Sequence, residues 1–139
     1  GGAAQTKAMK KMAASLRVEL AQYRELESFS QFGSELDKDT LSRLEHGKRL
    51  VEVLKQPQYQ PMSMEEQVMI LYAVNKRYLA DIPVEEILEF ERQFLEFMAG
   101  KEPEVGQAIA QEKVLSSQTE EKLASALQRF KEEFLKERT

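Results

Sequence analysis

The side chains best suited to acid–base chemistry in this sequence are its carboxylates, and adjacent pairs of them include Glu65-Glu66, Glu85-Glu86 and Glu132-Glu133. Two carboxyl groups that face each other can act as general acid and general base. Each of these pairs falls in a predicted helix, however, where neighbouring residues point in different directions. Two of the pairs also lie in first helical turns, where negative charge is favourable in itself. The spacing therefore disfavours a carboxylate-based hydrolase.

The chain lacks the residues that usually bind metal ions or act as nucleophiles. The chain has no cysteine and one histidine, His46, so neither a thiolate site nor an imidazole cluster can form. His46 precedes Gly47 on a charged helical stretch, and we expect it to be exposed to solvent. The sequence therefore predicts no catalytic residue, no metal site and no cofactor for the chain itself.

The charge of the chain argues against two classes of partner. The net charge is −4 and the pI about 5.2, which disfavours binding to a nucleic-acid backbone. A local basic cluster contains Lys7, Lys10, Lys11 and Arg17; a solvated helical face explains it better than an anion site. No run of about 18 apolar residues is present, so direct membrane insertion is not expected.

Two glutamines lie in a polar segment that is bracketed by prolines. Gln56 and Gln58 flank Pro57, and Pro61 follows three residues later. A glutamine amide offers both a donor and an acceptor of hydrogen bonds, so this segment could contact a polar ligand. The phosphate cradle GxxxxGKS/T is absent from the chain. On composition alone, the segment is better described as a polar surface loop.

Helices must position these side chains. Apolar residues recur at steps of three and four, and no segment alternates with period two. The predicted fold class is all-α: a single domain over residues 1–139, forming a compact bundle of about five to six helices. Four of the expected helices cover residues 5–31, 63–79, 83–100 and 103–113. The second helix in chain order is expected to run from a cap at Asp37 or Asp39 to about residue 55, and the last from residue 117 into the charged tail.

Capping residues and helix breakers define these boundaries. Ser63 with Glu66, and Ser117 with Glu120, have the spacing of capping boxes. Gly33 is expected to end the first helix, and Pro83 to open the fourth. Gly47 is interpreted as a close-packing position, and a local irregularity of the helix is the alternative. The two prolines Pro57 and Pro61 are expected to keep the second helix from crossing the glutamine segment.

The helical periodicity predicts which apolar residues face the core. The inner faces are expected to contain Met9, Met12, Leu16, Leu20, Tyr23, Leu26 and Phe29; Leu41, Leu44, Val51 and Leu54; residues 68–74; Val84, Ile87, Leu88, Phe94, Leu95 and Met98; and Leu123, Leu127, Phe130 and Phe134. Met62, Phe90 and Phe97 are interpreted as exposed positions. An independent helical adaptor that binds partner helices would use such residues, and it is the alternative function.

Several strings in a fixed order resemble a known family. They are GGAAQTKAMKK at 1–11, AQYREL at 21–26, QFGSELD at 31–37, LKQPQYQPM at 54–62 and PMSMEEQV at 61–68. Together they resemble the C-terminal helical domain of the alpha subunit of bacterial-type rotary F-type ATP synthases. Beyond about Ala80 the resemblance is one of pattern. It implies that the barrel and nucleotide-binding domains lie upstream, together with the phosphate loop and the arginine finger.

The resemblance implies a function and partners. In this family three alpha and three beta subunits form a ring that makes ATP from ADP and phosphate with a proton gradient. The complex is peripheral, at the cytoplasmic face of the membrane. The domain would be structural or regulatory and not itself an enzyme. It would contact beta subunits and the upstream alpha-subunit domains, while ATP and Mg²⁺ would bind in the intact subunit.

The resemblance also implies roles for individual residues. Gln56 and Gln58 match the glutamines that lie by the adenine of the family's non-catalytic nucleotide. Glu35, Asp37 and Asp39 occupy the place of the acidic DELSEED motif of the homologous beta subunits, next to the rotating gamma subunit. Lys38 interrupts this acidic run, and helix capping explains the same residues without a rotor.

Overall fold

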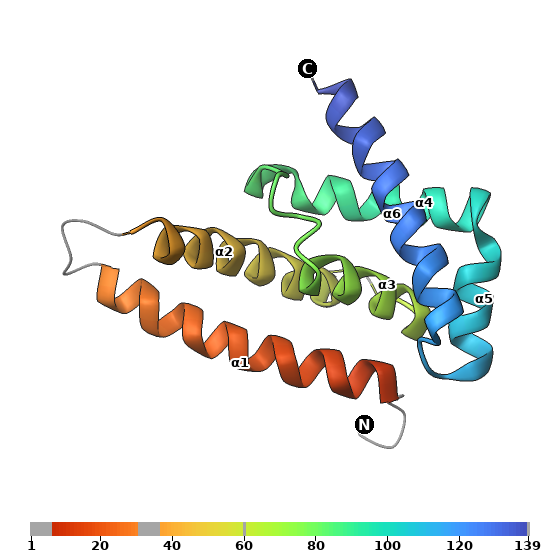
Figure 1. The fold of residues 1–139 in the computed structure, drawn as a ribbon, viewed down its shortest axis with the longest axis horizontal. Helices are drawn as coiled ribbons and strands as arrows, with labels where there is room; N and C mark the ends of the chain where they lie inside the picture. Colours follow the sequence, from red (N-terminus) through yellow and green to blue (C-terminus); the bar gives the residue numbers. More distant parts are fainter. Residues whose placement is uncertain (1–6, 31–36, 60, 139) are drawn as a thin grey trace.

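The computed structural model describes residues 7–30, 37–59 and 61–138, and of residues 7–9, 30 and 56–59 it describes the backbone alone. Over these ranges the protein is all-α and contains no strand, as the sequence predicts (Figure 1). The helices are α1 (Lys7–Ser30), α2 (Lys38–Tyr59), α3 (Met64–Asn75), the short 3₁₀ helix η2 (Val84–Glu86), α4 (Ile87–Lys101), α5 (Pro103–Glu112) and α6 (Ser117–Glu137).

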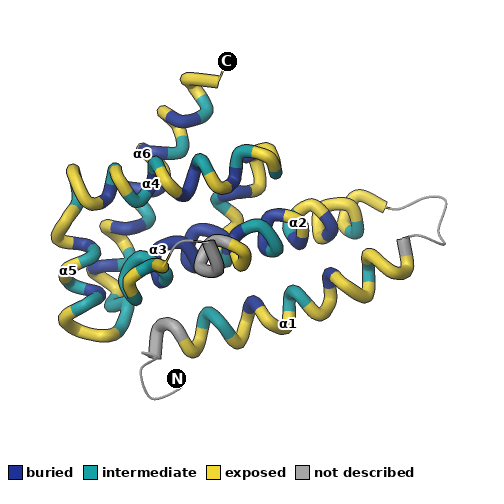
Figure 2. Tube along the Cα trace, turned by 180° about the vertical axis from the view of Figure 1, so that it is seen from behind, coloured by how far each residue is buried: buried dark blue, intermediate teal, exposed yellow. Residues whose placement is uncertain are grey.

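The centre of the bundle is α3, which is buried at every position from Val68 to Val74. Helix α1 runs along α2 and α3, while α5 packs on the other side of α3 (Figure 1). Helix α4 packs against α2, α5 and α6. Buried residues gather where α2, α3 and α4 face one another, and α1 is exposed along most of its length (Figure 2). A helix enclosed in this way explains the unbroken apolar run at residues 68–74.

Phenylalanine rings join α4 to α6. Phe90 meets Phe130 and Phe134 edge-to-face, with ring centroids 5.1 and 5.0 Å apart. Phe94 and Phe97 also pack on Phe130, at 5.6 and 5.4 Å. Phe90 is 0% exposed, so its assignment to the surface was wrong. The cause is that three helices enclose α4, so that it buries a wide arc and not one narrow stripe.

Side-chain caps begin two helices as predicted. The Ser63 hydroxyl accepts a hydrogen bond from the Glu66 backbone N–H, and the Glu66 carboxylate accepts one from the Ser63 N–H at 2.9 Å. This capping box starts α3. The Asp37 carboxylate accepts from the Thr40 N–H at 2.7 Å, so Asp37 and not Asp39 caps α2.

The cap of α6 differs from the prediction by one residue. Ser116 accepts a hydrogen bond from the Thr119 N–H at 3.2 Å, and Ser117 is already helical. The predicted capping box of Ser117 and Glu120 was therefore wrong. Two consecutive serines satisfy the cap preference equally well, so residue type does not distinguish them in the sequence.

Two helix ends also lie elsewhere than expected. Helix α2 continues through Pro57 to Tyr59, so Pro57 does not end it. In a last turn, a proline removes one hydrogen bond without interrupting a longer helix. Helix α3 ends at Asn75 and not near Leu79.

Helix α3 ends without the glycine that commonly marks the C-terminal end of a helix. Arg77 adopts the left-handed conformation, with φ 66°, that glycine usually occupies at such a helix end. The Tyr78 N–H donates to the Ala73 carbonyl at 3.0 Å and the Arg77 N–H donates to Val74 at 3.2 Å. These bonds satisfy the last carbonyls of α3, and an arginine in this conformation leaves no signal in the sequence.

Helices α1 and α2 touch closely at Gly47. A Cβ atom placed on Gly47 would lie 2.1 Å from the Cδ1 atom of Tyr23. The interpretation of Gly47 as a close-packing position is therefore confirmed.

The buried face of α2 is rotated from the predicted one. Leu50 and Val53 are buried at 0% and 2% exposure, while the predicted Leu41 and Leu54 are 47% and 37% exposed. The reason is that α2 is covered by α1 on one side and by α3 and α4 on another, so that one stripe does not describe it. Phe29 on α1 and Leu88 on α4 are also exposed, contrary to prediction.

Candidate functional site

The two predicted adenine contacts lie at the end of α2. Gln56 and Gln58 belong to its last turn, and the segment that follows leads through Pro61 into α3. Their side chains lie outside the described residues. The backbone places them in a helix end and not in the open loop that their composition suggests.

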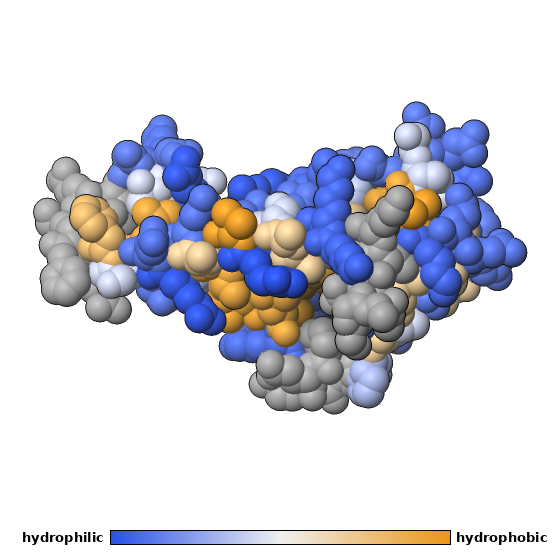
Figure 3. Space-filling model, turned by 90° about the horizontal axis from the view of Figure 1, so that it is seen from below, coloured by the Kyte–Doolittle hydropathy of each residue, from blue (hydrophilic) through white to orange (hydrophobic). Residues whose placement is uncertain are grey.

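An apolar hollow adjoins this segment. It has a volume of about 180 Å³ and is formed by α1, by α2 and by the start of α3; its walls are Ala13, Leu16, Arg17, Val53, Leu54, Met62, Gln67, Ile70 and Leu71. Leu54 and Met62 flank the glutamine segment on both sides. Figure 3, which views the molecule from below, shows apolar atoms near the centre of the face that carries α1. Met62 is half-buried in this hollow and not fully exposed as predicted.

The predicted rotor-facing acids lie around the start of α2. Glu35 falls outside the described residues. Asp37 caps the helix through Thr40, and that backbone hydrogen bond is the main reason that its pKa is lowered. Asp39 forms an exposed ion pair with Arg43 at 3.2 Å. Asp37 and Asp39 are therefore exposed acids at one end of the α1–α2 pair.

His46 is not exposed, contrary to prediction. Its side chain is 11% exposed, and its Nε2 atom shares a 2.6 Å hydrogen bond with the carboxylate of Glu19 on α1. Gly47 beside it allows α1 to approach, so α1 covers this part of α2. Nothing in the local pattern around His46 indicates a contact between residues 27 positions apart.

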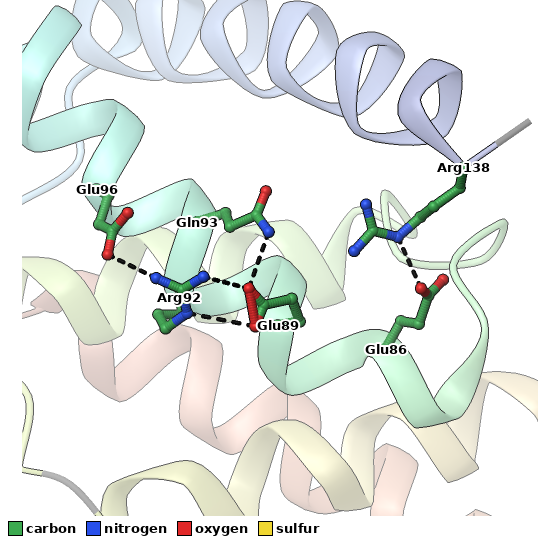
Figure 4. Close-up of polar contacts among 6 residues, drawn as sticks. All are labelled: Glu86, Glu89, Arg92, Gln93, Glu96 and Arg138. Carbon is green, nitrogen blue, oxygen red and sulfur yellow. Dashed lines mark hydrogen bonds and ion pairs between the residues drawn. The ribbon is translucent and has the colours of Figure 1, made fainter.

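Carboxylates on η2 and α4 are held by two arginines and one amide (Figure 4). Arg92 binds Glu89 and also donates to Glu96 at 2.7 Å, and Gln93 donates to Glu89 at 2.8 Å. The hydrogen bond from Arg92 is the main reason that the pKa of Glu89 is lowered to about 2. Such groups stay ionised at neutral pH and cannot serve there as general acids.

The adjacent glutamates considered above as possible dyads also have separate surroundings. Glu86 accepts from Arg138 at 2.7 Å, while Glu85 is exposed (Figure 4). Glu66 is engaged in the capping box of α3. Glu132 accepts from Gln128 at 3.1 Å. One member of each pair is thus engaged, in a cap, an ion pair or a hydrogen bond to an amide, in agreement with the helical interpretation of their spacing.

Two buried charged residues were not anticipated from the sequence. Arg49 on α2 is 8% exposed, and its Nε–H donates to the carbonyls of Leu79 and Ile82 at 2.8 and 2.9 Å. Its Nη1 donates to the carbonyl of Glu45 at 2.8 Å. Through these hydrogen bonds, Arg49 connects the turn between α3 and η2 to α2. The other such residue is Glu91 on α4, at 1% exposure.

The described ranges offer neither a metal site nor a membrane span. No group of three or more His, Cys, Asp or Glu residues in residues 7–30, 37–59 and 61–138 could hold a metal ion. No helix among these residues is long and apolar enough to cross a membrane.

Comparison with known proteins identifies the family. The family described as "ATP synthase alpha/beta chain, C terminal domain" matches residues 5–130. The sequence is 55% identical over 135 residues to ATP synthase subunit alpha of Clostridium kluyveri, which covers 97% of this chain and 27% of that protein. It is also 54% identical over 137 residues to ATP synthase subunit alpha of Clostridium botulinum strain Eklund 17B. That alignment covers 99% of this chain and 27% of that protein. The chain therefore spans about a quarter of these curated relatives, and it belongs to the family of C-terminal domains of ATP synthase alpha and beta subunits.

Proposed function

We propose that the protein serves as the C-terminal helical domain of an ATP synthase alpha subunit, within a complex that makes ATP from ADP and phosphate with a proton gradient. The observation that carries this proposal is the 55% identity over 97% of the chain to a protein named ATP synthase subunit alpha. The domain itself performs no turnover. It packs against upstream domains of its own subunit and against beta subunits, in a peripheral complex at the cytoplasmic face of the membrane.

The second part of the proposal concerns nucleotide binding. Gln56 and Gln58 supply hydrogen bonds to the adenine of the nucleotide, ATP with Mg²⁺, at the non-catalytic site of the intact subunit. The apolar hollow beside them supports this assignment, since an adenine needs an apolar surface next to its polar edge. At about 180 Å³ the hollow is too small to hold a whole nucleotide, and the phosphates bind elsewhere in the subunit.

Gln58→Ala in the full-length subunit tests this assignment. Loss of one neutral hydrogen bond, about 1 kcal/mol, should weaken ATP binding at the non-catalytic site about fivefold. Folding should be nearly unchanged, because Gln58 lies in a last helical turn. Isothermal titration calorimetry measures the affinity. Gln118→Ala, at an exposed position of α6, is the matched control and should leave the affinity as it was. Equal affinities for both variants would remove Gln58 from the site.

The isolated domain provides a complementary measurement. Two side-chain hydrogen bonds do not offset the cost of ordering a ligand, so we expect millimolar affinity for ATP or weaker, and no hydrolysis. Micromolar binding to the isolated domain would mean that a phosphate site exists within these residues, and the proposed division between domains would be wrong.

The third part of the proposal places the start of α2 at the rotor. Glu35, Asp37 and Asp39 face the gamma subunit in the assembled complex. Two observations support this: Asp37 and Asp39 are exposed, and they lie together at one end of the α1–α2 pair.

Single-cysteine cross-linking tests the rotor contact. These 139 residues contain no cysteine, so Asp39→Cys introduces the one thiol among them. In the assembled complex we expect a thiol-reactive cross-linker of short reach to join this residue to the gamma subunit. Asp37 is left intact because it caps α2. Ser125→Cys, at an exposed position of α6, is the control and should give no such product. Equal yields from both positions would contradict a rotor-facing role for this loop.

An independent helical adaptor is the less favoured function. It rested on exposed Met62, Phe90 and Phe97, but Phe90 is fully buried and the other two are half-buried against the core.

A further inference from the structure

Glu91 on α4 is a carboxylic acid enclosed in the apolar core. It is 1% exposed, and neither of its carboxyl oxygens has a hydrogen-bond partner. The residues one turn away on either side, Ile87 and Leu95, are both apolar. Buried polar groups in folded proteins nearly always have a partner, and those without one call for an explanation. Neither the helical pattern nor the proposed nucleotide site uses Glu91.

Charged groups on the surrounding elements do not compensate for Glu91. Those that are not fully exposed are Arg49, Glu52 and His46 on α2 (His46 is bound to Glu19 of α1), Glu86 on η2, and Glu120 and Lys131 on α6; α5 carries the exposed acids Glu104 and Glu112. The arginine and the lysine are engaged elsewhere: Arg49 with the carbonyls of Leu79 and Ile82, and Lys131 with Asp81 at 3.0 Å. Glu52 of α2 is near enough to act on Glu91, and it adds repulsion.

This environment favours the neutral form of the acid. The pKa of the Glu91 carboxyl group is raised from 4.5 to about 8. Desolvation by burial is the larger cause, and repulsion from Glu52 is the smaller one. At neutral pH the side chain therefore holds its proton. When the O–H bond breaks and the proton leaves for solvent, a charge remains in an apolar site where no cation compensates it.

We propose that Glu91 is a proton-binding site that controls how closely α4 packs against α2. With the proton bound, the neutral carboxyl group remains in the core and the two helices stay in contact. Without it, the carboxylate must reach water, and the solvent edge of the interface lies at Glu52, whose side chain is 25% exposed. Helix α4 then moves away from α2. The role of Glu91 does not depend on the assignment of Gln56 and Gln58.

The direction of the pH dependence follows from the two pKa values. Between pH 4.5 and about 8 the folded protein holds a proton that the unfolded protein has lost. The stability from this proton is fully present below pH 4.5 and is lost as the pH rises to about 8. Over that range the unfolding constant should increase by up to about tenfold for each pH unit, and it should level off above it.

Glu91→Gln, which keeps the shape but cannot ionise, tests the site. We expect the urea midpoint of the unchanged protein to fall between about pH 5 and pH 8, and that of Glu91→Gln to stay nearly level. Glu96→Gln, on the same helix but exposed, should behave as the unchanged protein does. An infrared carbonyl band of a protonated carboxylic acid should also be present at neutral pH and absent in Glu91→Gln. The same pH slope for all three proteins, or no such band, would overturn the proposal. If Glu91→Gln fails to fold, titration of the infrared band in the unchanged protein decides alone.

A second variant tests the movement of the helix. Ile87→Cys places a thiol one turn before Glu91 at a position that is 0% exposed. Its labelling rate is measured with and without Glu91→Gln, because the ratio of the two rates cancels the pH dependence of the thiol itself. We expect this ratio to be near one at about pH 6 and to rise severalfold at about pH 9. A ratio that stays at one would show that ionisation does not open this interface.

Discussion

We expect Gly47→Ala to lower the free energy of unfolding by about 1–3 kcal/mol, although alanine is the better helix former. The added Cβ would lie 2.1, 2.3 and 2.7 Å from the Cδ1, Cγ and Cβ atoms of Tyr23. These atoms are the base of the ring and not a flexible end, so a rotation of the side chain does not relieve the overlap. The two helices must separate, and the contacts around His46 and Glu19 are weakened with them.

Gly100→Ala provides the matched control within the same protein. Gly100 also lies in a helix, α4, and a Cβ placed there has no atom within 4 Å. We expect this substitution to raise the free energy of unfolding by up to about 1 kcal/mol, because nothing opposes the helix preference of alanine. Urea denaturation followed by circular dichroism measures both variants. Equal stabilisation by Gly47→Ala and Gly100→Ala would mean that α1 and α2 do not approach each other closely at Gly47.

Arg49→Met should have the largest effect of a single side chain, a loss of about 3–5 kcal/mol. Methionine fills much of the same volume, but the carbonyls of Leu79 and Ile82 lose the donor that binds both of them. Arg49→Lys should recover little of this loss, because an ammonium group cannot reproduce the planar fork of the guanidinium.

Arg43→Met, on the same helix, separates this effect from the loss of a positive charge. The ion pair of Arg43 with Asp39 is exposed on both sides, at 60% and 73%, so we expect a change within about 0.5 kcal/mol. Thermal and urea denaturation of the three variants gives the ranking. A loss at Arg49 no greater than that at Arg43 would mean that the turn between α3 and η2 does not depend on this contact.

Features set by neighbours in the sequence were predictable here. The Ser63–Glu66 capping box was found where the sequence places it, because it follows from two residue types with a strong local preference. The close packing at Gly47 was also found, but its partner Tyr23 lies on another helix and could not be named from the sequence. The end of α3 was missed because Arg77 takes a conformation for which an arginine gives no indication. The number of helices was predicted well, and their ends less so.

Features set by distant neighbours were not predictable. Leu50 is buried because α2 has partners on more than one side, and Phe90 because three helices enclose α4. His46 is covered by Glu19, which lies 27 residues away in the sequence. Glu91 is a charged residue type, so a prediction from apolar periodicity assigns it to the surface and not to the core.

The candidate nucleotide site divides in the same way. The similarity in sequence selects Gln56 and Gln58 without reference to geometry, and they remain predictions. The structure adds the apolar hollow between Leu54 and Met62, which composition does not reveal because its walls come from three helices.

The phenylalanine cluster has a consequence for the protein as it is being synthesised. Phe90 lies on α4, while its edge-to-face partner Phe134 lies on α6 and is translated 44 residues later. At a synthesis rate of 5–20 residues per second, this delay is about 2–9 s. For that time the emerging α4 exposes aromatic surface that its later partner will cover. This nascent segment is therefore where a ribosome-associated chaperone would find its binding surface, and slow codons between the two helices would prolong the exposure.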